Sequence, residues 1–442
     1  MKRLVSIEAH GLFGALDHKI NLDTERGITI IHGANGTGKT TLLRAVSQLS
    51  KSIPPFLSHL KFKDIRLTFS DTTSIVTKKD GRHLQLEEWR NQKRINQFNT
   101  KEISGRTTRL NQYEMMRHLA GDEVTPLGSG DWFISGRVVS PDEIWEHIPL
   151  SSLTTTLARQ KSLFGEHEIV PKWLTNFWSQ FRCTLIEEQR LLRVAEDRKK
   201  GKPLFKRVVE DYADKVRTLI KDVLGEYAEH SQSLDRSFPR RVVEALEKPS
   251  PNADLVSKKL NDIERRRDEL YLAGLLEKES SINRFDPSKL GRQETVQVLS
   301  VYAADTESKL EKFSEIHKKI TLFEDLVNSH FVRKSARISK DAGLVLQTDS
   351  GENLDPAALS SGEQHLLVLC YELIFGGFHS NHLVMIDEPE LSLHPAWQLR
   401  FIDDLERVRE VNQMDFVLAT HSPQVIGGNW GLTRELSVQA GT

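Results

Sequence analysis

The segment IIHGANGTGKTTLL, residues 30–43, places a glycine-rich loop between a β-branched run and an apolar helical run. Its centre, residues 33–40, fits the pattern G-x-x-x-x-G-K-[ST]. Glycines let the backbone curl so that its N–H groups point inward at a phosphate, and the helix that begins at Lys39 adds its dipole. The preceding strand and the following helix are the context that this pattern requires. The segment therefore predicts a phosphate-binding loop in an α/β fold, and the alternative is a glycine-rich βα turn that binds nothing.

The polar residues of this loop have distinct expected roles. Lys39 is expected to reach the β- and γ-phosphates of a nucleotide, and the Thr40 hydroxyl to ligate Mg²⁺. ATP and Mg²⁺ are therefore the expected cofactors. The residues predicted to bind the nucleotide here are Gly33, Asn35, Gly36, Gly38, Lys39, Thr40 and Thr41.

A second segment, LVMIDEPE at 383–390, supplies two acidic residues. Four apolar residues carry Asp387 and Glu388 to the carboxyl end of a strand, where parallel α/β sheets bind ligands. We expect Asp387 to hold Mg²⁺ directly or through water, and Glu388 to orient or deprotonate the attacking water. Because strands that end in acidic residues are common, this interpretation depends on the loop at 33–40.

The rest of the chain predicts an alternation of strands and helices. Strand-like alternation occurs at 3–9 and 16–22, and hairpin patterns occur at 65–81 and 335–351. Apolar residues at helical spacing form two stripes, 256–270 and 310–327, which we expect to pair as antiparallel helices. Residues 395–411 are expected to form one helix with proline at its first position.

Composition excludes some classes of partner. The chain has 442 residues with 61 Lys plus Arg and 62 Asp plus Glu, so no global field attracts nucleic acid or anionic membranes. One local patch of basic residues is a candidate for binding the phosphates of DNA, and the alternative is a solvated face. It contains Arg198, Lys199, Lys200, Lys202, Lys206 and Arg207. Two cysteines and no apolar run of membrane-spanning length indicate a cytoplasmic protein.

Three further segments resemble motifs of ABC-type ATPases. ALSSGEQHLL at 358–367 resembles the LSGGQ-like signature, although an ordinary N-capped helix is the alternative. LATHSP at 418–423 resembles the switch segment whose histidine, here His421, contacts the γ-phosphate. Gln189 in LIEEQRLL is the candidate that links Mg²⁺ to the helical region, and a polar strand end is its alternative. The signature positions are Leu359, Ser360, Ser361, Gly362 and Glu363, with Ser361 where Gly is usual and Glu363 where Gln is usual.

Together these segments resemble the ABC-type P-loop ATPases of the SMC/RecF/OLD group, a branch of the AAA-family ATPases, over about residues 1–75, 180–195 and 330–430. The resemblance implies an α/β ABC-ATPase head with a mixed sheet and a large, mainly helical insertion. It implies that signature residues from a second copy complete each ATP site, in a homodimer or higher homo-oligomer. The expected domains are an N-terminal lobe (1–80), an insertion of unclear organisation (81–180), a returning strand (181–195), a helical or short coiled-coil insertion (196–330) and a C-terminal lobe (331–442).

Within this group, the segments IEEQRLL and DEPELSLHPAWQ are most similar to ATPase subunits of anti-phage defence systems, Septu first and PARIS second. This narrower resemblance implies a sensor or scaffold ATPase that regulates a separate HNH or Toprim nuclease subunit. Only about twenty residues follow His421, where OLD-type nucleases carry a Toprim domain. The alternatives are a RecF/SMC-like DNA-repair ATPase that binds DNA and an ATP-gated interaction module that does not hydrolyse ATP.

Overall fold

A five-stranded parallel sheet contains the strand that precedes the glycine-rich loop. Its order is β11-β14-β15-β3-β16, and every neighbouring pair is parallel. The three central strands are almost wholly buried, as expected for a parallel sheet covered on both faces. The strands are β3 (Ile28–His32), β11 (Cys183–Ile186), β14 (Leu383–Asp387), β15 (Asp415–Ala419) and β16 (Thr433–Glu435).

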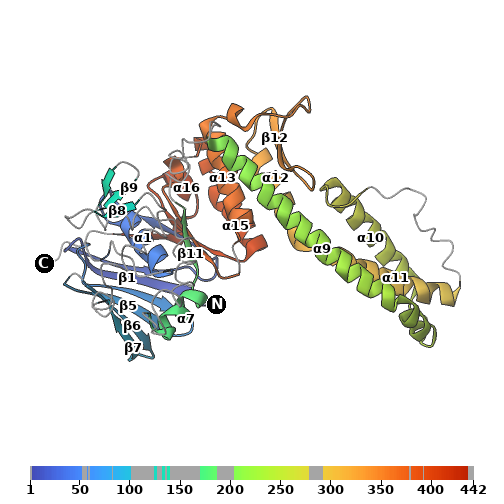
Figure 1. The fold of residues 1–442 in the computed structure, drawn as a ribbon, viewed down its shortest axis with the longest axis horizontal. Coiled ribbons are helices and arrows are strands. Elements are labelled where there is room, and N and C mark those ends of the chain that lie inside the picture. Colours follow the sequence, from blue (N-terminus) through green and yellow to red (C-terminus); the bar gives the residue numbers. More distant parts are fainter. Residues whose placement is uncertain are drawn as a thin grey trace. The chain divides into compact units, whose positions relative to one another are not determined.

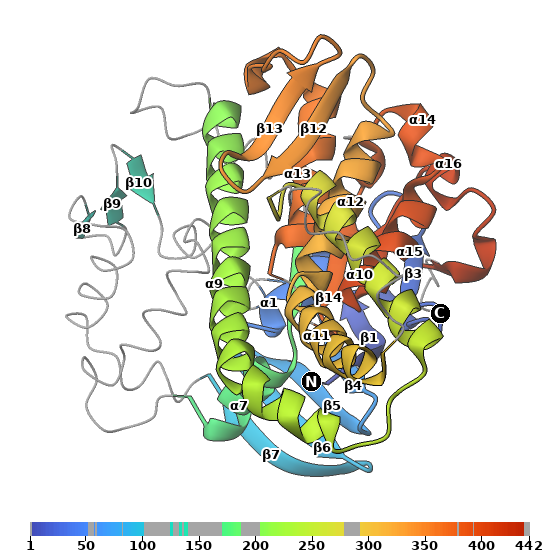
Figure 2. The same ribbon diagram turned by 90° about the vertical axis from the view of Figure 1, so that its right-hand side faces the viewer.

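The computed structural model, shown in Figures 1 and 2, divides into two units. The first unit comprises residues 1–188, 379–391 and 413–442, and the second comprises residues 189–378 and 392–412. The structure describes residues 2–51, 57, 60–81, 83–100, 124–126, 132–134, 137–139, 170–186, 204–277, 292–377, 380–391 and 393–436.

A six-stranded antiparallel sheet forms the other large part of the first unit, in the order β2-β1-β4-β5-β6-β7. Strands β6 and β7 extend this sheet past residue 80, where the sequence placed the end of the N-terminal lobe. The strands are β1 (Leu4–Leu12), β2 (Leu16–Asn21), β4 (Asp64–Phe69), β5 (Thr73–Asp80), β6 (His83–Arg90) and β7 (Lys93–Asn99). A separate small sheet contains β8 (Val124–Pro126), β9 (Trp132–Ile134) and β10 (Arg137–Val139).

One hydrophobic core joins both large sheets to two helices, α1 (Lys39–Leu49) and α7 (Lys172–Gln180). Leu42 and Leu43 of α1 are buried in it, and so are Leu174 and Phe177 of α7. Helix α7 therefore belongs to the packed first unit, although the sequence placed its residues in an insertion. The unit is completed by η6 (Pro389–Leu391), α16 (Pro423–Ile426) and η7 (Trp430–Leu432).

The second unit is mainly helical (Figure 2). Its long helix α9 packs against α11, which also packs against α10, while α12 contacts α13, α15 and β12. The elements are α9 (Leu204–Leu246), α10 (Ala253–Leu272), α11 (Gln293–Glu311), α12 (Ser314–Asn328), β12 (Lys334–Ser339), β13 (Gly343–Thr348), η5 (Pro356–Ala358), α13 (Ser361–Phe375), α14 (Pro395–Gln398) and α15 (Phe401–Asn412).

Two helix predictions were wrong in detail. The apolar stripe at 310–327 spans the break between α11 and α12 and therefore does not form one helix. The helix that pairs with α10 is α11. The helix expected at 395–411 is divided into α14 and α15, although Pro395 does occupy its first position. The expected strands at 3–9 and 16–22 and both hairpins are confirmed, as is the α/β class.

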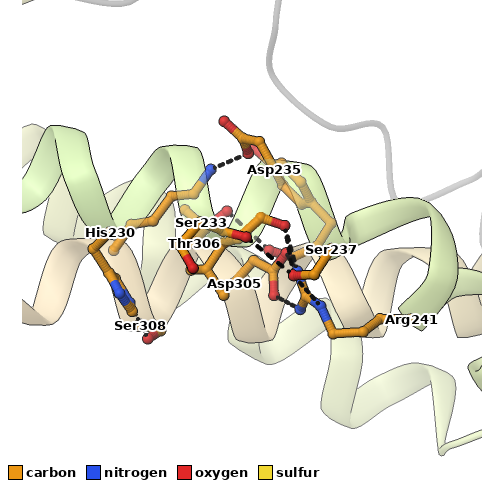
Figure 3. Close-up of polar contacts among 11 residues, drawn as sticks. His230, Ser233, Asp235, Ser237, Arg241, Asp305, Thr306 and Ser308 are labelled. Atoms are coloured by element: carbon orange, nitrogen blue, oxygen red, sulfur yellow. Dashed lines mark hydrogen bonds and ion pairs between the residues drawn. The ribbon is translucent and has the colours of Figure 1, made fainter.

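Side-chain contacts cross-link α9 to α11 (Figure 3). Arg241 of α9 forms a two-pronged ion pair with Asp305 of α11 and also donates to the Leu234 carbonyl, 2.8 Å away. Pro239 interrupts the hydrogen-bond ladder of α9 because it has no N–H. Arg241 therefore ties α9 to α11 beside the proline. Among the described helices, none is both long and apolar enough to cross a membrane.

Candidate nucleotide-binding site

The carboxyl ends of β3, β15 and β14 bring three of the predicted segments to one edge of the parallel sheet. Asp387 is paired with Ala419, and Ala419 is paired with Ile31. The glycine-rich loop, the acidic pair and the segment with His421 leave the sheet at this edge. This is the position at which open parallel sheets bind ligands.

The loop at 33–38 is held in shape by its neighbours. Gly38 precedes α1 with φ +89, and a Cβ at this position would lie 2.7 Å from Leu12 Cδ2 and 3.0 Å from Phe13 Cε2. The backbone conformation therefore favours glycine, and a Cβ would also displace the Leu12 side chain. The buried His18 ring donates from Nε2 to the Thr37 carbonyl at 2.8 Å. The hairpin of β1 and β2 thus braces the loop from outside.

The residues predicted to bind the nucleotide lie in the loop before α1 and in the first turn of α1. Lys39, Thr40 and Thr41 form the first turn of α1, and Asn35 and Gly36 are exposed in the loop before it. Phe13 is 47% exposed, and its aromatic side chain lies beside Gly38 of the loop. This ring has the chemistry to stack on a nucleobase.

Lys39 lies at the centre of the charged groups. Its Nζ donates to the carbonyls of Gly33 and Ala34 at 3.0 and 3.3 Å and lies 2.5 Å from Nε2 of His421. Burial lowers the pKa of Lys39, and the nearby carboxylates of Glu388, Asp387 and Glu390 only partly oppose that effect. A desolvated ammonium surrounded by polar groups is suited to bind an anion.

The acidic pair ends β14. Asp387 is 9% exposed, and Glu388 follows it with φ +47, the left-handed region that a glutamate rarely adopts. Such a conformation costs about 1–3 kcal/mol and is concentrated at functional sites. The Glu388 carboxylate lies 3.9 Å from Nε2 of His421. The turn therefore directs Glu388 toward the same space as Lys39.

Two residues of the site were missed by the sequence interpretation. Glu390 accepts hydrogen bonds from the backbone N–H groups of His421 and Ser422 at 2.7 and 3.2 Å. His18 holds the loop carbonyl described above. The sequence signals were a third carboxylate in DEPE and a single histidine at an inward position of β2, and neither pattern specifies a role.

The signature residues lie in the second unit, at the start of α13. Ser360 caps the helix, and Ser360 and Glu363 form a reciprocal capping box. Lys334 also donates to the Glu363 carboxylate, at 3.0 and 3.1 Å. Burial would raise the pKa of Glu363, but the hydrogen bonds from Ser360 and Lys334 outweigh it and lower the pKa. Ser361 and Gly362 occupy the first helical turn, and a Cβ added to Gly362 would lie 3.8 Å from the Trp397 ring.

Some predicted residues cannot be placed. Gln189 and the basic residues at 198–202 lie outside the described residues, as do the side chains of Lys206 and Arg207. The strand before Gln189, β11, is the neighbour of β14. Both cysteines, Cys183 and Cys370, are buried, and burial raises the pKa of the Cys183 thiol to about 12.

The chain is similar to known families and to a curated protein. The family described as "AAA ATPase domain" matches residues 142–426, and the family described as "AAA domain" matches residues 5–123. A protein of Escherichia coli named "Retron Ec83 probable ATPase" is 35% identical over 81 residues, which are 18% of this chain. The matched part spans only 14% of that relative's length.

Solved structures of Smc head domains are also similar. The head domain of Pyrococcus furiosus, with an extended coiled coil and bound to the C-terminal domain of ScpA, is 16% identical with a TM-score of 0.38. That alignment covers 100% of this chain and 94% of the other. The head domain of Thermotoga maritima is 10% identical with a TM-score of 0.32, covering 96% and 91% of the two chains.

Proposed function

Because the chain belongs to the AAA ATPase domain family, we propose that it binds ATP with Mg²⁺ at the sheet edge formed by β3, β15 and β14 and hydrolyses it. One observation carries the proposal. Lys39, Glu388 and His421 come from three separate segments, and the His421 ring lies within 4 Å of both the Lys39 ammonium and the Glu388 carboxylate. A purely structural turn would not need a buried lysine, a strained glutamate and a histidine at one point.

The proposed chemistry assigns one task to each group. Lys39 and the loop N–H groups bind the β- and γ-phosphates, and His421 contacts the γ-phosphate. Glu388 orients the attacking water and accepts its proton. Thr40 and Asp387 would hold Mg²⁺, which supplies charge neutralisation at the phosphate oxygens. Gln189 is proposed to connect this metal position to the helical region.

We propose that a second copy of the chain completes each site with Ser360, Ser361 and Gly362. Ser361 and Gly362 supply N–H groups in the first turn of α13, and the Ser360 hydroxyl, which donates to the Glu363 carboxylate at 2.9 Å, would exchange that partner for a γ-phosphate. Glu363 is engaged by Ser360 and Lys334, so its charge is offset at the helix start. ATP would then hold a homodimer or larger oligomer together. We also propose that each copy is divided into an N-terminal lobe, a helical insertion and a C-terminal lobe.

For the cellular role, we propose an ATPase subunit that regulates a separate HNH or Toprim nuclease in anti-phage defence. The motif resemblance to Septu and PARIS ATPases supports this role, and the partial match to a retron ATPase supports its ATPase component. Co-expression with neighbouring reading frames, followed by purification with ATP, tests it. A purified chain that binds no neighbouring product, but whose ATPase rises with DNA, would favour the DNA-repair alternative.

The enzymatic proposal is tested by variants of the site. Glu388→Gln should bind ATP, release no phosphate and accumulate ATP-dependent assemblies in light scattering after gel filtration. Lys39→Ala should lose ATP binding. Glu25→Gln, in an exposed turn of the same unit, is the matched control and should behave as the parent. Parental phosphate release by Glu388→Gln would refute the role of Glu388 as the base.

A further inference from the structure

Glu390 lies three residues beyond Asp387, in the short turn η6. Its Oε1 accepts the backbone N–H of His421 at 2.7 Å and that of Ser422 at 3.2 Å. The two segments are 31 residues apart in sequence. A carboxylate from the loop after β14 thus holds the backbone of the loop after β15.

The local backbone explains why this carboxylate reaches the neighbouring loop. The N–H of Glu388 donates to the Ala419 carbonyl at 2.8 Å, which extends the pairing of β14 with β15 by one residue. The left-handed conformation of Glu388 then turns the chain, and the Leu391 N–H closes the turn on the Glu388 carbonyl at 3.2 Å. Glu390 is therefore carried toward the end of β15.

A third carboxylate at this edge works against phosphate binding. Glu390 acts electrostatically on Lys39 together with Asp387 and Glu388, so the three acids share one environment. Like charges repel, and a triphosphate would meet all three. Hydrogen bonds from N–H groups to a carboxylate are stronger than neutral ones and spread its charge. The repulsion between Glu390 and a triphosphate is thus offset only if those hydrogen bonds contribute to the function of the site.

The loop that Glu390 holds carries the imidazole of His421. That ring lies 2.5 Å from Nζ of Lys39 and 3.9 Å from the Glu388 carboxylate, both measured from Nε2. The ring is one-third exposed, so surrounding side chains do not enclose it. Its position depends on its own backbone, and Glu390 holds the N–H of that backbone.

We propose that Glu390 is a positioning residue for ATP hydrolysis, which keeps the imidazole of His421 between Lys39 and Glu388. This inference rests on the proposed ATPase function. Glu390 acts through the backbone of His421 and does not itself react. Its importance should therefore vanish when the imidazole is absent.

The test compares Glu390→Leu with Glu390→Gln, whose amide oxygen can still accept both N–H groups. Glu390→Leu should lower kcat at least tenfold with the ATP KM changed less than threefold. Glu390→Gln should retain most of the parental kcat. Hydrogen exchange of the peptide around His421 should accelerate in Glu390→Leu and not in Glu390→Gln. Glu25→Leu, an exposed substitution in the same unit, is the control for both readouts.

A double-mutant cycle with His421→Ala separates positioning from mere structural support. In the His421→Ala background, Glu390→Leu should have little further effect on kcat. Independent, multiplicative losses would overturn the inference, and so would unchanged hydrogen exchange in Glu390→Leu. Failure of the proposed function has a different signature, because Lys39→Ala and Glu388→Gln would then leave phosphate release unchanged.

Discussion

Replacing Gly343 with alanine should disrupt the packing of the β12–β13 hairpin on α9. Gly343 is the first residue of β13 and has φ +72. A Cβ built on it would lie 2.0 Å from the carbonyl oxygen of Ala213 in α9, and 2.6 Å from that carbonyl carbon. The obstructing atoms are backbone, so a rotamer change cannot relieve the contact. The hairpin would have to move away from the helix by at least about 1 Å, because contacts below 3.0 Å are not observed for real Cβ atoms.

The expected cost has two parts that a second glycine separates. A left-handed conformation costs an L-residue roughly 1–2 kcal/mol. Overpacking against a fixed neighbour adds about 1–3 kcal/mol. Gly351, in the turn after β13, has φ +81, and no atom lies within 4 Å of the place that a Cβ would occupy, so Gly351→Ala incurs only the first part. Alanine restricts the unfolded chain equally at both positions, so that contribution cancels in the comparison.

The measurement is urea denaturation followed by far-UV circular dichroism, which reports mainly on the helices of the second unit. Gly343→Ala should lose about 1–3 kcal/mol more unfolding free energy than Gly351→Ala, the overpacking part alone. Insoluble Gly343→Ala beside soluble Gly351→Ala would agree with the same reasoning. Equal losses in the two variants would show that the close approach of β13 to α9 does not contribute, and the reasoning would be refuted.

Three further predictions concern hydrogen-bonded groups. His18→Gln keeps a donor for the Thr37 carbonyl and should retain ATP affinity, whereas His18→Leu leaves that carbonyl unsatisfied and should weaken ATP binding about tenfold in calorimetric titration. Arg241→Ala leaves the nearly buried Asp305 carboxylate without its cationic partner and should destabilise the second unit by about 3–5 kcal/mol. The double variant Arg241→Met/Asp305→Leu should regain most of the lost unfolding free energy in urea denaturation. Burial would raise the pKa of Glu87, but hydrogen bonds from side chains of β5, β6 and β7 outweigh it and hold the pKa at about 2. Its contribution to stability is therefore complete above about pH 4.5 and is lost as the pH falls toward 2, so Glu87→Gln should flatten the acid limb of the stability curve of the first unit.

The central strands could be predicted because their sequences are continuous apolar runs bounded by glycine or charge. Strand β14 and strand β15 are of this kind, and both are buried on each face. Strand β7 (Lys93–Asn99) could not be predicted, because it is largely exposed and polar. It is a strand because β6 pairs with it, and the residue pattern of β7 itself does not predict that pairing. The same limit applies to the break between α11 and α12, since helical spacing of apolar residues continues across Lys312 and Phe313.

Some residues of the candidate site could likewise be predicted from the sequence, and others could not. Lys39, Asp387, Glu388 and His421 stand in motifs that are defined by residue type and spacing, so a linear pattern is enough to predict them as site residues. Glu390 and His18 act on backbone groups 31 and 19 residues away, and any residue can supply a backbone group. No pattern at the receiving position reveals such a bond, and only the folded chain brings its two ends together.

Strand order explains why the loop that carries the histidine emerges between the lysine and the glutamate. Strand β15 lies between β3 and β14, so the loop that leaves it emerges between the phosphate loop and the acidic pair. Neighbouring strands are about 4.8 Å apart, a distance that one side chain on each side can bridge. A residue placed just past the end of β15 therefore contacts both neighbours if its backbone is held, and His421 lies 2.5 Å from Lys39 and 3.9 Å from Glu388. The sheet supplies the proximity and Glu390 supplies the restraint, so moving the histidine by one residue along this loop should separate it from both partners even though the motif residues remain.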